Sequence, residues 1–263
     1  MIQTTSNNAG GTGRTPSAPP RWPVRRGICA AFVLALLPVL AHARPAGHTT
    51  TWANLGLADR NVVRYAEAVD ATRETVGGTP QDAIAWYNLG IAHLAGKRYA
   101  EAVDANQEAV RLDPTFADAW QNLGFAYANL ARYADAIAAE RQAVRLNPKN
   151  ADAWQNLGFA FAQLARYPEA IDAYREVVRI APDRTVAWYS LGVNYTALNR
   201  YTDAVDPLRQ AVRLNPDYAD AWYVLGLAYA GSGDRISALE CVQPLRRLDP
   251  ARADALFNVV GPR

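Results

Sequence analysis

Hydrophobic and small residues recur at helical spacing through residues 49–252. In the segment that begins at Ala83, four of them fall at i, i+3, i+4 and i+7, on one stripe of a helix: Trp86, Leu89, Gly90 and His93. A second stripe follows after a short polar break and contains Ala102, Ala109, Val110 and Leu112. The pattern therefore predicts two amphipathic helices joined by a short turn.

The same pattern returns every 34 residues. Six tryptophans keep this spacing: Trp52, Trp86, Trp120, Trp154, Trp188 and Trp222. Starting each unit three residues before its tryptophan gives six repeats, 49–82, 83–116, 117–150, 151–184, 185–218 and 219–252. Residues 253–260 resemble the start of a further first helix, so we expect 253–263 to cover the end of the stack.

Small residues, prolines and acids mark where these helices pack, begin and end. Gly90 and Ala102 are expected to be small because paired helices approach to about 8–10 Å. A proline near the end of every unit is expected to terminate each second helix, and an acid in the first turn of the second helix opposes the positive helix end. Pro207 and Pro244 fall inside second helices, so we expect the array to be least regular across its fifth and sixth units.

The first 43 residues differ from the rest of the chain. They contain four arginines and no acid, and an apolar run from Ile28 to Leu40 leads to Ala41-His42-Ala43. This is typical of an export signal cleaved after Ala43, with 44–48 as a linker, and predicts a periplasmic or secreted protein. The alternative is an inner-membrane anchor formed by an uncleaved leader, although the run is shorter than the ~20 residues that a membrane span needs.

The motif W-x2-L-G-x2-Y, followed by Ala and Pro at this period, resembles the tetratricopeptide repeat. The resemblance covers residues 49–252 and implies an all-α fold, an α-α superhelix of six helix-turn-helix repeats with a short C-terminal capping helix. It also implies that the first helices line a concave groove that binds segments of other proteins.

Each unit is numbered from its first residue, and positions 2, 5, 6, 9, 12 and 13 are predicted to face this groove. Position 6 is Asn in four successive units, and an amide can both donate to and accept from a peptide backbone. The column resembles the asparagine ladder of the superhelical repeats in O-linked N-acetylglucosamine transferases, although Asn is also common here across the repeat family. The candidate groove residues are Asn54, Asn88, Asn122, Asn156, Tyr87, Gln121, Gln155, Phe125, Phe159, Tyr189 and Tyr223.

Composition gives no support to other chemistry. Removing the leader lowers the number of basic residues from 27 to 23 against 25 acids, so nucleic acid binding is not expected. We expect no metal, cofactor or catalytic group, because His48 and His93 cannot form a triad and Cys241 replaces a small core residue. Rows of arginines at the turns and helix ends are interpreted as solvated edges.

The sequence thus predicts a non-enzymatic scaffold that binds a protein or peptide segment in the cell envelope. The alternatives are a self-assembling structural component and an envelope polysaccharide assembly or secretion factor, so the oligomeric state stays open.

Overall fold

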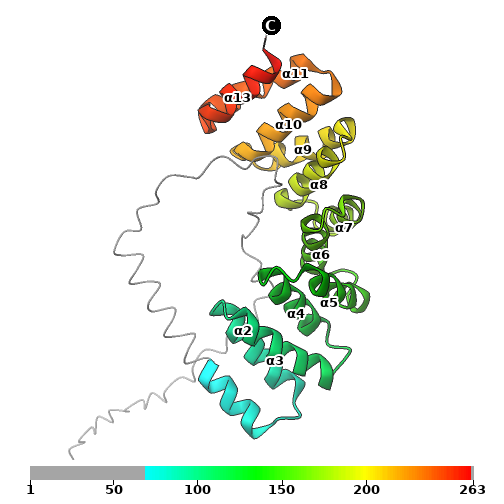
Figure 1. Ribbon diagram of the computed structural model, residues 1–263, viewed down its shortest axis with the longest axis vertical. Helices are drawn as coiled ribbons and strands as arrows, with labels where there is room; N and C mark the ends of the chain where they lie inside the picture. Colours follow the sequence, from blue (N-terminus) through cyan, green and yellow to red (C-terminus); the bar gives the residue numbers. More distant parts are fainter. Residues whose placement is uncertain (1–68, 262–263) are drawn as a thin grey trace, which may run out of the picture. The chain divides into compact units, whose positions relative to one another are not determined.

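The computed structural model describes residues 69–261. These residues form helices without strands, and a helical segment at 69–78 precedes the first complete one. The helices follow one another along the array (Figure 1): α2 (Ala83–Ala95), α3 (Tyr99–Leu112), α4 (Ala117–Asn129), α5 (Tyr133–Leu146), α6 (Ala151–Gln163), α7 (Tyr167–Ile180), α8 (Thr185–Ala197), α9 (Tyr201–Leu214), α10 (Ala219–Ser232), α11 (Arg235–Glu240), α12 (Val242–Leu248) and α13 (Pro250–Val260). The predicted all-α array of hairpins is confirmed, while most of the first unit and the leader lie outside the described residues.

Each even-numbered helix from α2 to α10 is the first helix of a hairpin and packs against the second helix that follows it. Each of α4, α6, α8 and α10 also packs against the second helix that precedes it. Successive first helices also contact each other, as α2 does with α4 and α8 with α10. Among the described residues, no two successive second helices make comparable contact. The row of first helices is therefore the more closely spaced one.

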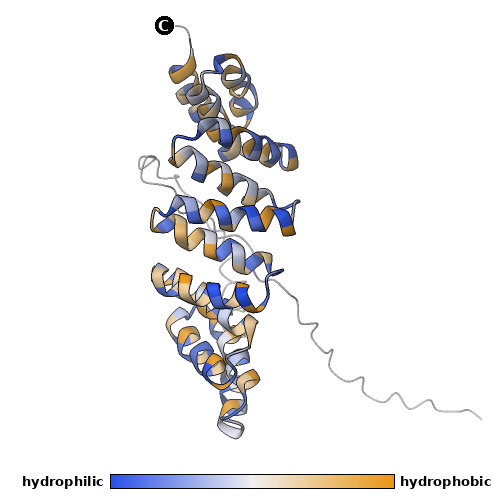
Figure 2. Cartoon of the chain, turned by 90° about the vertical axis from the view of Figure 1, so that its right-hand side faces the viewer, coloured by the Kyte–Doolittle hydropathy of each residue, from blue (hydrophilic) through white to orange (hydrophobic). Residues whose placement is uncertain are grey.

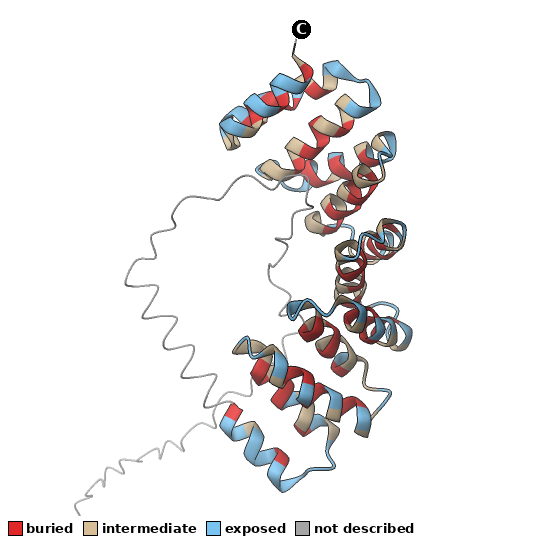
Figure 3. Ribbon diagram, in the orientation of Figure 1, coloured by how far each residue is buried: buried red, intermediate tan, exposed pale blue. Residues whose placement is uncertain are grey.

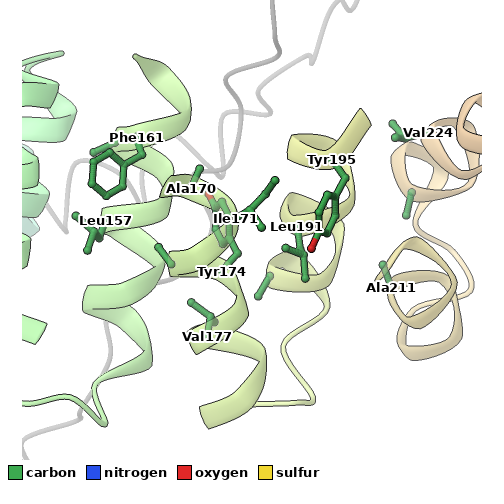
Figure 4. Close-up of a cluster of buried hydrophobic side chains, with 14 of the residues drawn as sticks. Leu157, Phe161, Ala170, Ile171, Tyr174, Val177, Leu191, Tyr195, Ala211 and Val224 are labelled. Carbon is green, nitrogen blue, oxygen red and sulfur yellow. The ribbon is translucent and has the colours of Figure 1, made fainter. Parts of the chain in front are cut away.

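The core is a continuous layer between the two rows of helices. Buried residues face one another across each hairpin, whereas exposed residues lie on the outer sides of the helices (Figure 3), and apolar and polar residues alternate along each helix (Figure 2). Figure 4 shows this arrangement for Leu157 and Phe161 of α6, Ile171 and Tyr174 of α7, and Leu191 of α8. Burial of such a layer against each neighbour stabilises the array through nearest-neighbour contacts.

The glycine that recurs in each first helix allows the two helices of a hairpin to approach closely. A Cβ added to Gly124 would lie 2.6 Å from Cγ of Glu140, and one added to Gly158 would lie 3.1 Å from the Tyr174 ring. Ala102 is completely buried, as the pattern predicted. The residue opposite the glycine differs from unit to unit, so each hairpin has its own core side chain: Asn106, Glu140, Tyr174 and Leu208.

The repeated tryptophans and prolines form one contact. The indole N–H of Trp154 donates to the carbonyl oxygen of Pro148 at 3.0 Å, and the other four described tryptophans of the series do the same to the proline six residues earlier. Each proline lies two residues beyond the end of a second helix, as at Pro148 after Leu146. The half-buried indole therefore holds the loop between units against the core.

The turn inside each hairpin uses a left-handed residue. Its φ is 58° at Lys97, 58° at Ala131, 54° at Ala165, 57° at Asn199 and 89° at Gly233. Around Ala131 the backbone N–H of Arg132 donates to the Tyr127 carbonyl at 2.9 Å, which closes the end of the first helix. Two of the five turns thus place alanine in a conformation that favours glycine.

The two internal prolines have different effects. Helix α9 continues through Pro207, so the expected irregularity does not break the second helix of the fifth unit. In the sixth unit the second helix is divided into α11 and α12 at Cys241, three residues before Pro244. Because proline clashes with the carbonyl four residues earlier, here that of Glu240, the break lies where the ring would disturb the helix.

The last hairpin ends on α13, which begins three residues before the predicted cap. Leu256 is fully buried and lies against Gly226, and the Arg235 guanidinium donates to the Val260 and Gly261 carbonyls at the end of α13. These contacts tie α13 to both α10 and α11. None of the described helices is long and apolar enough to cross a membrane.

Candidate functional site

The predicted groove residues lie on the first helices, and we call the surface formed by positions 2, 5, 6 and 9 of these helices the first-helix face. Tyr87 and Asn88 come from α2, and Tyr189 and Tyr223 come from α8 and α10. Helices α4 and α6 each supply residues at positions 5, 6 and 9: Gln121, Asn122 and Phe125 on α4, and Gln155, Asn156 and Phe159 on α6. All are half-buried except Asn88, which is exposed, and Asn54 lies outside the described residues.

In the five units that the structure describes in full, the side chain at position 5 contacts the last residue of its own unit. Two of these pairs are aromatic, with ring centroids 4.6 Å apart for Tyr87–Phe116 and 4.9 Å apart for Tyr189–Tyr218. The other three use polar groups: Asn150 Nδ2 donates to Gln121 Oε1 at 2.8 Å, Arg184 to Gln155 Oε1 at 3.3 Å, and the Arg252 guanidinium lies 6.0 Å from the Tyr223 ring centroid. The last residue of each unit therefore belongs to this surface.

Sequence reasoning missed these five partners, Phe116, Asn150, Arg184, Tyr218 and Arg252. A signal was present in four of the five pairs, because positions 29 residues apart match in chemistry: aromatic with aromatic, and amide with amide or arginine. The fifth pair, Tyr223 and Arg252, does not follow this rule.

The predicted asparagine column is not uniform. Asn156 Nδ2 donates to the Glu140 carboxyl at 2.9 Å, so this amide already has a partner in the preceding hairpin. Burial raises the pKa of Tyr87, the nearby Asp118 carboxylate adds to the rise, and a side-chain hydrogen bond to Asn122 opposes it. The Asn88 side chain makes no hydrogen bond among the described residues.

The polarity of the residue at position 6 matches that of the core residue in the preceding unit. Asn156 meets Glu140, Ser190 forms a side-chain hydrogen bond with Tyr174, and Val224 takes the place that corresponds to a buried Leu208. A polar residue at position 6 thus lies against a polar core residue, and an apolar one corresponds to an apolar core residue. These side chains therefore contribute to the packing between successive hairpins.

Glu140 is the most unusual group near this surface. Its side chain is completely buried, its Oε2 atom has no partner among the described residues, and burial raises its pKa well above the ordinary value, against a smaller lowering by the Asn156 hydrogen bond. Burial therefore favours the neutral form of this carboxyl, which packs under Gly124 as a polar core residue.

Most arginines of the two rows that the structure describes form ion pairs at the surface. Arg98, Arg132, Arg166 and Arg200 each pair with the acid three residues later, at the start of the second helix. In the second row, Arg111 and Arg179 pair with Glu108 and Glu176. These are exposed i, i+3 pairs, which contribute little to stability.

Reactive side chains in the described part of the chain are placed in the core. His93 is buried, and burial and then the Arg98 charge lower its pKa. Burial raises the pKa of the Cys241 thiol to about 12, so it is protonated at neutral pH. The described residues contain no cluster of His, Cys, Asp and Glu that could hold a metal ion.

Comparison with known proteins agrees with this geometry. Family profiles described as tetratricopeptide repeat match residues 54–115, 105–138 and 122–185, and a TPR repeat profile matches 194–233. A search of the curated proteins finds no match.

Solved structures with the same fold include YrrB, whose description reads "a TPR protein with an unusual peptide-binding site". It is 22% identical with a TM-score of 0.67, over 73% of this chain and all (100%) of its own. MamA is 23% identical with a TM-score of 0.61, over 65% of this chain and 94% of its own. MamA from Desulfovibrio magneticus RS-1, residues 41 to the end, is 23% identical with a TM-score of 0.59, over 64% and 96%. The repeat profiles and the stacked hairpins together show that the chain belongs to the tetratricopeptide repeat family.

Proposed function

We propose that this protein is a non-enzymatic scaffold whose first-helix face binds an extended segment of a partner protein. The observation that carries the proposal is the row of large side chains at position 9. Ile91, Phe125, Phe159, Val193 and Leu227 come from five successive first helices, and each stays half-exposed. A continuous apolar row beside amides and tyrosines offers contact area and hydrogen bonds to a chain that crosses the helices.

Two further points support a protein ligand. Proteins of this family are generally protein-interaction scaffolds, and YrrB is described as having a peptide-binding site. The amides of Asn88 and Gln163 on the first helices make no hydrogen bond among the described residues and can pair with a peptide backbone. As part of the same proposal, the leader-like segment at 1–43 supports binding in the periplasm or outside the cell.

The test uses a peptide-display library panned against the whole chain, with binding of selected peptides measured by fluorescence anisotropy. Phe125→Ala removes an apolar contact from the middle of the face and is expected to weaken binding about tenfold or more. Leu214→Ala is the matched control, because Leu214 is 37% exposed at the end of a second helix. Equal affinities for the two variants, or a library that yields no binder, would contradict the proposal.

The asparagine column adds a second arm. Replacing Asn88, Asn122 and Asn156 by Ala is expected to weaken binding if these amides hold the peptide backbone. Asn88→Ala alone is the informative variant, because Asn88 has no hydrogen bond in the described part of the chain, and its loss leaves the core unchanged.

Self-assembly remains the second candidate, favoured by one observation. Ile236, Phe257 and Val259 are 76%, 40% and 59% exposed in the last hairpin. Sedimentation over a concentration series tests it, since a strict monomer excludes this function and a dimer lost in Val259→Ser supports it.

A further inference from the structure

In two units, an arginine of the same unit pairs with an aspartate at position 2 of the first-helix face. In the fourth unit, Arg184 Nη1 pairs with Asp152 at 2.5 Å and also contacts Gln155. In the sixth unit, Arg252 pairs with Asp220 and lies over the Tyr223 ring. In both, the arginine is the last residue of the unit, and the acid is its second residue.

The third unit has the acid without the arginine. Asp118 corresponds to Asp152 and Asp220, but Asn150 stands where the other two units carry arginine. The Asn150 side chain is held elsewhere, because Oδ1 accepts the backbone N–H groups of Asp152 and Ala153 and Nδ2 donates to Gln121. Asp118 is exposed and makes no ion pair within residues 69–261.

Aromatic rings flank this carboxylate. Tyr87 and Phe116 form the aromatic pair of the preceding unit, and the Asp118 charge contributes to the raised pKa of Tyr87, after burial. The same surroundings occur three units later, where Tyr189 and Tyr218 lie beside Asp220. There, Arg252 pairs with Asp220, and its charge lowers the pKa of Tyr189 against the rise caused by burial and by Asp220.

An acid in the first turn also stabilises its helix, which accounts for the presence of Asp in all three units. It does not account for the arginine that two of the units supply. A carboxylate beside two aromatic rings attracts a cationic group both by charge and through the ring faces.

We propose that Asp118, Gln121, Tyr87 and Phe116 form a subsite for an arginine or lysine side chain of the bound segment. This subsite rests on the proposed function and makes it specific: the segment carries a basic residue where it crosses the third unit. The cation would occupy the place that Arg184 and Arg252 occupy in their own units.

The first experiment pans a random peptide library against the whole chain and three variants. Asp118→Asn removes the charge, and Asn150→Arg gives the third unit an arginine of its own, as in the fourth and sixth units. Asp172→Asn is the matched control, because it also removes one carboxylate, from a side chain that is 76% exposed on a second helix. Wild type and control are expected to enrich a basic residue at one peptide position, and both site variants are expected to lose this preference, with about tenfold weaker binding of the selected peptides.

The second experiment needs no peptide. N-acetyl-arginine amide is titrated into the chain and followed by amide NMR shifts at Tyr87, Asp118 and Gln121, with N-acetyl-citrulline amide as the neutral comparator. Saturable shifts with arginine alone, absent in Asp118→Asn and Asn150→Arg, support the subsite.

The outcomes separate the two claims. Peptides selected without a basic position, or unchanged binding in Asp118→Asn, overturn the subsite and leave peptide binding intact. A library without binders together with a positive arginine titration refutes the peptide function and supports the subsite. Failure of both experiments overturns both.

Discussion

The contact between Glu140 and Asn156 predicts a coupling that can be measured. The carboxyl is fully buried and has one hydrogen bond, from Asn156 Nδ2 at 2.9 Å. Asn156→Val leaves this carboxyl without a donor, which costs about 1–3 kcal/mol. Glu140→Leu costs less, on the order of 0–1 kcal/mol, because Asn156 is only half-buried and water can replace its partner.

The double variant is expected to recover. Leu208 and Val224 already occupy the two corresponding places in later units, so Glu140→Leu with Asn156→Val reproduces a pairing that this fold accommodates. Replacing both partners of a buried polar pair by apolar groups is nearly neutral or stabilising. The double-mutant cycle should therefore give a coupling free energy of about 1–2 kcal/mol.

Urea unfolding followed by far-UV circular dichroism measures the free energy of each variant at pH 7. Because repeat arrays can unfold in parts, hydrogen exchange of the α5 and α6 amides localises the effect. The matched cycle combines Glu140→Leu with Asn88→Val, whose free energies should add. If the Glu140 and Asn156 effects also add within about 0.5 kcal/mol, the proposed pairing between hairpins is refuted.

Three other predictions test the core, the turns and the buried acid. Glu140 has a folded-state pKa raised above its ordinary value of 4.5, so its contribution to stability is present at low pH and is lost as pH rises through the raised pKa; urea midpoints should show this loss for wild type and not for Glu140→Gln. Gly192→Ala should lower the unfolding free energy by about 2 kcal/mol, because the new Cβ would overlap the Leu208 side chain. Gly158→Ala should cost less, because its Cβ would lie 3.1 Å from the Tyr174 ring, a tight contact that a small shift relieves; equal losses would contradict the packing. Ala131→Gly should raise stability by about 0.5–1 kcal/mol, because φ is 58° there, and thermal melting that shows a loss would count against the turn.

The hairpins could be predicted from sequence because one residue pattern repeats without interruption. Trp86 and Gly90 mark the same face in every unit, and a period of 34 residues allows each helix to be placed six times over. The break near Pro244 followed from the missing N–H and the clash of its ring, whereas Pro207 shows that the surrounding core can keep a proline-containing helix continuous.

The candidate surface was harder to predict because its side chains contact residues of other elements that are far away in the sequence. Helical spacing places Asn156 on the correct helix, but it does not reveal that its amide reaches Glu140 on the preceding helix. Likewise, the last residues of four units lie at the N-cap of the next first helix, where helical periodicity does not indicate their direction: Phe116, Asn150, Arg184 and Tyr218. Arg252 lies in the first turn of α13. Only the fold brings Phe116 onto Tyr87, and within residues 69–261 the nearby Asp118 carboxylate has no ion pair.

Site-specific photo-crosslinking in the native cell tests the central claim most directly. A benzoylphenylalanine at Phe125 reports on the first-helix face, and one at Asp172 reports on an exposed second helix. We predict that the probe at Phe125 links to one extended segment of a partner protein, mapped by mass spectrometry, and that the probe at Asp172 does not. Crosslinks to a defined segment from Asp172 with none from Phe125 would contradict binding on the first helices.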